Sequence, residues 1–141
     1  MYSYNKLLRL VEKLEAAKSE EEIKAIAKKE LAIWEIITNE IRKIASKLKN
    51  SGVLTNDEYM NLQDAYNNCE LIRLRLEWIV TPNPNLSKST KDLVQDIRNS
   101  LEAGYKKKLD SLIRGLKSKL NHVREEFKLL NVEIGDLEEL D

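Results

Sequence analysis

The feature that most constrains the fold is a stripe of apolar residues that extends from Val94 to Leu137. Its members recur every three or four residues, which places them on one face of an α-helix. They are Val94, Ile97, Leu101, Tyr105, Leu109, Leu112, Leu116, Leu120, Val123, Phe127, Leu130, Ile134 and Leu137. A helix with such a face is not stable alone in water. Other helices, from this chain or from a partner, must therefore cover it.

Three interruptions divide the chain into four helical segments. Ser19 with Glu22, and Thr55 with Glu58, have the spacing of capping boxes, and two prolines lie within residues 81–85. Helices are therefore expected at about 3–17, 20–49, 56–80 and 89–131, followed by an acidic tail at 132–141. We predict an all-α fold in a single domain, residues 1–141. Its architecture is an antiparallel three- or four-helix bundle with a long C-terminal helix that can extend as a coiled coil.

The last segment is too long to be covered evenly by the others. At 1.5 Å per residue it would be about 64 Å long, against about 36 Å for the third segment. The helix therefore either breaks, at Gly104 or Gly115, or overhangs the bundle. Each glycine costs about 1 kcal/mol in a helix, so close packing or a kink would account for both. Near Leu120 the stripe changes from the eleven-residue pattern of straight helices to the heptad of coiled coils.

The third segment carries a second, smaller apolar stripe of Leu71, Leu74 and Trp78. Tryptophan with aliphatic neighbours is typical of an interface anchor, although an inner helix buried on two sides would show the same pattern. The candidate protein-interface residues are Leu71, Leu74, Trp78, Leu120, Val123, Phe127 and Leu130.

The stretch between Tyr105 and Lys128 is basic, with eight Lys and Arg against three Asp and Glu. A basic helix face could contact phosphates, and the candidates for such contact are Lys106, Lys107, Lys108, Arg114 and Lys117. Alternatively, these charges only solvate the helix and are balanced by the acidic tail.

Composition narrows the classes of function. The 24 basic and 24 acidic residues cancel, so no net charge attracts the chain to nucleic acid or membranes. A single cysteine, Cys69, fits the reducing cytoplasm, and no apolar run is long enough to span a bilayer. His122 is the only histidine and no Glu-x-x-His pair is present. We therefore expect no catalytic site, metal, cofactor or small-molecule substrate.

These observations favour a non-enzymatic helical interaction or assembly module in the cytoplasm. Its partner would be a second copy or another helical protein, so that the chain is a homo-oligomer or a subunit of a larger complex. One alternative is a nucleic-acid-associated helical protein that contacts an RNA or DNA backbone through the basic face of the last helix. The other is a small viral or plasmid regulator that binds a host protein.

Overall fold

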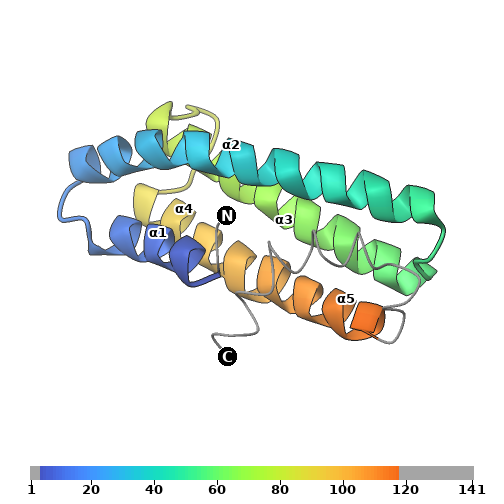
Figure 1. Ribbon diagram of the computed structural model, residues 1–141. Coiled ribbons are helices and arrows are strands. Elements are labelled where there is room, and N and C mark those ends of the chain that lie inside the picture. The colour runs from blue at the N-terminus through green and yellow to red at the C-terminus, as the bar shows by residue number, and fades with distance from the viewer. Residues whose placement is uncertain (1–3, 118–141) are drawn as a thin grey trace.

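The computed structural model describes residues 4–117, and within this range every element is helical and none is a strand (Figure 1). The prediction of an all-α fold is therefore confirmed. The elements are α1 (Tyr4–Ala16), α2 (Glu20–Ser51), α3 (Asn56–Val80), α4 (Thr90–Asn99), the π-helical segment η1 (Ser100–Lys106) and α5 (Lys107–Lys117). No helix in the described range is long and apolar enough to cross a membrane.

The helix starts follow from the capping residues. The Ser19 hydroxyl accepts a hydrogen bond from the Glu22 N–H at 3.1 Å. Thr55 forms a complete capping box, in which its hydroxyl accepts from the Glu58 N–H and its own N–H donates to the Glu58 carboxylate. These bonds satisfy amide groups that the first turn of a helix leaves without partners. At the other end of α2, Gly52 has a φ of 71°, the left-handed conformation that glycine adopts most readily.

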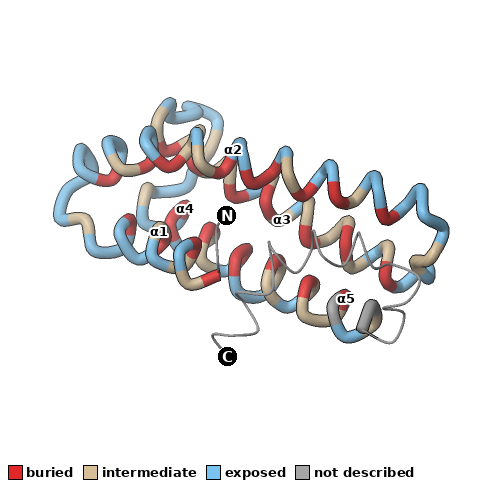
Figure 2. Tube along the Cα trace, viewed as in Figure 1, coloured by how far each residue is buried: buried red, intermediate tan, exposed pale blue. Residues whose placement is uncertain are grey.

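Helix α3 is the central element of the described structure. It packs against α2 on one side and against α4, η1 and α5 on the other, as Figure 1 shows. Helix α1 is shorter and lies against α2 and α4. Figure 2 shows that the buried residues lie where the helices face one another, and Trp34 and Tyr105 are the largest fully buried side chains.

The last helix does not break in the described range, because α4, η1 and α5 follow one another without interruption from Thr90 to Lys117. Its middle part is a π-helix, which was not predicted from the sequence. Here the stripe makes three successive four-residue steps, through Ile97, Leu101, Tyr105 and Leu109, and all four side chains are buried. An α-helix rotates about 40° beyond a full turn every four residues, so these steps would carry the stripe off its face. The wider π-turn offsets that drift.

Both glycines of the last helix lie where its backbone approaches α3. A Cβ at Gly104 would lie 2.0 Å from Oδ1 of Asn68, and a Cβ at Gly115 would lie 2.3 Å from Oε2 of Glu58. Close packing, one of the two predicted reasons, therefore accounts for both residues. The predicted remainder of the helix at 118–131 and the acidic tail at 132–141 lie outside the described residues.

Candidate functional site

Four apolar residues of α3, at two separate places along the helix, lie outside its fully buried core face. We call the outer face the four residues Met60, Leu71, Leu74 and Trp78. Met60 is 59% exposed and Leu71 is 39% exposed, whereas Leu74 and Trp78 are half-buried. The core face of the same helix is fully buried, with Leu62, Ala65, Cys69, Ile72, Leu76 and Ile79. The structure thus keeps the three predicted α3 interface residues near the end of the helix, with Trp78 packed against the core, and Met60 lies about three turns away from Leu71.

A hollow of about 380 Å³ lies beside Trp78, at the C-terminal end of α3. Its lining combines α2 and α3 and is largely apolar, with Leu31, Trp78 and Val80. Next to it, Arg73 bridges two carboxylates of α3, at 3.1 Å to Glu70 and 2.6 Å to Glu77. The outer face is therefore bordered by paired charges and by a cavity that could receive a partner's side chain.

The residues of the basic stretch point in different directions. Lys106 contacts Asp110 at 3.3 Å and lies 5.4 Å from the ring centre of Tyr4, so it faces α1. Lys108 lies 3.4 Å from Asp64 of α3. Consecutive helical residues differ by about 100° in direction, which explains this separation.

The other two described candidates for phosphate contact, Lys107 and Arg114, are exposed. They are seven residues apart and so share a helix face. The side chain of Lys117 and the four candidate interface residues Leu120, Val123, Phe127 and Leu130 lie outside the described part of the chain.

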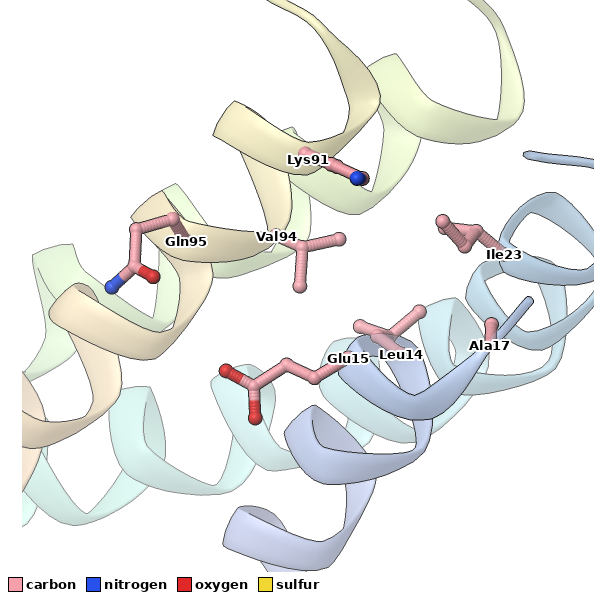
Figure 3. A pocket seen from close by; sticks show the side chains of 7 residues that line it. All are labelled: Leu14, Glu15, Ala17, Ile23, Lys91, Val94 and Gln95. Carbon is pink, nitrogen blue, oxygen red and sulfur yellow. The ribbon is translucent and has the colours of Figure 1, made fainter. Parts of the chain in front are cut away.

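Figure 3 shows a second hollow, of about 180 Å³, where α1, α2 and α4 meet. Leu14, Ile23 and Val94 line its interior, and the polar ends of Glu15 and Gln95 lie at its edge. Arg98 of α4 donates hydrogen bonds to both carboxylate oxygens of Glu15, at 2.6 and 2.8 Å. This hollow is thus a packing gap beside the contact between α1 and α4.

No protein-family model, curated protein or solved structure matches this chain. Within residues 4–117, no group of three or more His, Cys, Asp or Glu is arranged to hold a metal ion. Cys69 is fully buried, and burial raises the pKa of its thiol far above the ordinary value.

Glu30 is a buried ionisable group that was not predicted from the sequence. The residue is 3% exposed, and neither carboxylate oxygen has a hydrogen-bond partner in the described structure. Burial raises its pKa from 4.5 to about 8, because a low-dielectric surrounding disfavours the charged form, and Lys13 of α1 only partly offsets this effect. Its place on the apolar face of α2, between Ala27 and Trp34 in helical spacing, is the signal that could have revealed it.

Proposed function

We propose that this protein is a non-enzymatic helical interaction module that binds a second copy of itself, or another helical protein, through the outer face of α3. The observation that carries the proposal is the exposure of Met60 and Leu71 on the central helix, with Leu74 and the core-packed Trp78 following Leu71 at helical spacing. Removing a large apolar side chain from water stabilises a complex by about 1.5–3 kcal/mol when the side chain was fully exposed. The two exposed members and the cavity beside Trp78 supply such surface.

The surroundings of the outer face also support an interface. Protein interfaces commonly have an apolar centre with a tryptophan anchor and a polar border. Trp78 provides the anchor, and the ion pairs of Arg73 with Glu70 and Glu77 provide part of the border. Because these charged groups are already paired with one another, a partner that approaches does not bury an unpaired charge, which would be costly.

The proposal also covers how the helices are arranged within the all-helical fold. We infer that the helices form an antiparallel bundle and that the heptad residues extend it as a coiled coil with a partner. The support is the spacing of Leu120, Val123, Phe127 and Leu130, together with the continuous helix that reaches Lys117. A cytoplasmic location is also part of the proposal and is supported by the single cysteine.

The test is self-association of the whole chain, measured by multi-angle light scattering and sedimentation over a wide concentration range. A double variant, Leu71→Lys with Leu74→Lys, places two charges on the outer face and should shift the protein towards monomer. The control is Ile36→Lys, which changes a 51% exposed aliphatic residue on α2. An equal effect of the control would show that the outer face is not the interface.

If the wild-type protein is strictly monomeric, a second experiment tests whether the outer face binds another protein. In that experiment, the wild-type chain and the double variant are used to capture helical proteins from a lysate after nuclease treatment. Partners retained by the wild type and lost by the double variant support the proposal. A monomeric protein whose captured partners do not change with the double variant contradicts it.

Nucleic-acid association is the second candidate, because Lys107 and Arg114 form an exposed pair on one face of α5. Binding to RNA or DNA should weaken steeply as salt rises, since each phosphate contact releases counterions. The double variant Lys107→Ala with Arg114→Ala should flatten this salt dependence. A double Lys28→Ala and Lys43→Ala variant removes two exposed charges from α2 and serves as the control. No binding at low salt would exclude this candidate.

A further inference from the structure

A hollow of about 200 Å³ between α2 and α3 is lined by hydrogen-bond donors, separately from the outer face of α3. Its lining residues are Arg42, Ala45, Ser46, Lys49, Tyr59, Gln63 and Tyr66. Two of them are cations, four carry a hydroxyl or amide group, and no carboxylate of the described chain is among them. A hollow with this lining favours an anionic ligand.

The two cations, Arg42 and Lys49, lie about two turns apart on α2. Arg42 donates one hydrogen bond, from Nη2 to Oδ1 of Asn39 at 3.2 Å, and a guanidinium has five N–H donors. Lys49 lies seven residues further along the helix, with its ammonium 5.5 Å from the ring centre of Tyr59. The aromatic ring holds this ammonium beside the hollow without neutralising it.

The side chains from α3 complete the set of donors. Tyr59 accepts a hydrogen bond from Gln63 at 3.2 Å, which leaves the hydroxyl hydrogen of Tyr59 to donate. The Tyr66 hydroxyl donates its hydrogen to the carboxylate of Glu70 at 3.4 Å, and Glu70 is itself paired with Arg73 at 3.1 Å. Burial and the charge of Glu70 raise the pKa of Tyr66, so its hydroxyl remains protonated at neutral pH. Glu70 thus has a cationic partner, Arg73, which it shares with Glu77.

We propose that this hollow binds a phosphate monoester of a small ring-containing molecule, of which a nucleoside monophosphate is the representative. A terminal phosphate has three oxygens that accept hydrogen bonds, more than a carboxylate offers, and the lining supplies donors from both helices. The volume exceeds that of a phosphate group alone, and two aromatic side chains, Tyr59 and Tyr66, line the hollow together with the cations, where the ring of a ligand can contact them.

The experiment is a titration of the ¹⁵N-labelled full chain at low salt, with inorganic phosphate, AMP and adenosine as separate probes. AMP should bind saturably and at least as tightly as inorganic phosphate, and adenosine should bind more weakly than AMP. The amide shifts should concentrate in residues 42–49 and 59–66. Arg42→Gln and Lys49→Gln should each weaken AMP binding about tenfold, the loss expected for one charge-assisted hydrogen bond.

The matched controls are Lys43→Gln and Lys47→Gln, which remove exposed cations of the same helix that do not line the hollow. They should change AMP affinity less than twofold. Three results would each overturn the proposal: no saturable AMP binding at 10 mM, equal affinity for adenosine and AMP, or equal losses in the control and lining variants. The readout does not depend on self-association, so it remains independent of the proposed function.

Discussion

Oδ1 of Asn68 lies 2.0 Å from the position that a Cβ on Gly104 would occupy. The Asn68 side chain, which projects from α3, therefore packs directly against the backbone of η1 at Gly104. The amide group of Asn68 is also held in place, because its Nδ2 donates to the carbonyl of Asp64 at 2.7 Å. A methyl group at residue 104 must therefore displace a side chain that already has a partner. This contact explains why a glycine is retained in the interior of a helix.

Gly104→Ala should destabilise the protein, although alanine is the better helix former. Displacing Asn68 breaks its hydrogen bond, at a cost of about 0.5–1.5 kcal/mol, and strains the packing, at a cost of about 1–3 kcal/mol. Together these exceed the gain of about 1 kcal/mol in helix propensity. In an Asn68→Ala background the obstacle is gone, and Gly104→Ala should become neutral or stabilising. Urea unfolding of the four proteins in this double-mutant cycle measures the coupling. A loss that is the same in both backgrounds would contradict the contact.

Glu30 should make stability depend on pH. Its pKa is about 8 in the folded chain, against an ordinary value of 4.5, so between these values the folded state holds a proton that the unfolded state releases. Stability should be unaffected below the lower value, fall as pH rises from 4.5 towards 8, and level off above that range. One pKa unit corresponds to about 1.4 kcal/mol, so the full loss is on the order of 5 kcal/mol.

The test of Glu30 compares urea unfolding at pH 5 and pH 8.5. Glu30→Gln keeps the shape of the side chain and cannot ionise, so the slope between these two pH values should largely disappear. Glu35→Gln changes an exposed carboxyl on the same helix and should retain the slope of the wild type. A wild-type protein equally stable at both pH values would show that Glu30 is not buried as described.

The attachment of α1 should depend on Arg98. Its two hydrogen bonds to Glu15 are partly shielded, with the side chains 25% and 30% exposed, so we expect a contribution of about 1 kcal/mol. Glu15→Gln should reduce the hydrogen-exchange protection of amides in Tyr4–Ala16 more than that of amides in α3. Glu12→Gln, an exposed carboxyl on α1, is the control. Unchanged protection of α1 in the Glu15 variant would mean that apolar packing alone holds this helix.

Cys69 should be unreactive in the folded protein. Its side chain is fully buried, and burial raises the pKa of the thiol, so little of the reactive thiolate forms at neutral pH. A thiol reagent should label it slowly under native conditions and rapidly in denaturant. Because Cys69 is the only cysteine in the chain, the absorbance change reports one site. Rapid labelling of the native protein would contradict the packing of α3 against its neighbours.

The sequence was sufficient for the helical class and for the capped starts of two helices in the described range. Ser19 and Thr55 mark starts through bonds to residues three positions along, and such local bonds can be read from spacing alone. The second stripe of α3 was also visible, because two apolar faces of one helix appear directly in its periodicity.

Other features depend on contacts between segments that are distant in the chain. The π-turn at Ser100–Lys106 was not predicted, since four-residue steps are compatible with more than one helix geometry. In the sequence, Lys106–Lys108 form one continuous basic run. In the structure, Lys106 faces Tyr4 of α1, whereas Lys108 pairs with Asp64 of α3. The hollow that contains Arg42 and Tyr66 joins residues of two helices whose relative rotation no local pattern specifies.

The apolar stripe that begins at Val94 therefore determined by itself that this chain forms helices whose apolar faces must be covered. The reason is that the spacing of residues along a helix fixes the direction in which their side chains point. Only the tertiary structure decided which helices cover it and how closely. It placed α3 against the last helix at Gly104 and Gly115, and it left Glu30 without a hydrogen-bond partner in the described core. Packing and desolvation act between segments that are remote in sequence, so their consequences appear only when the helices are assembled.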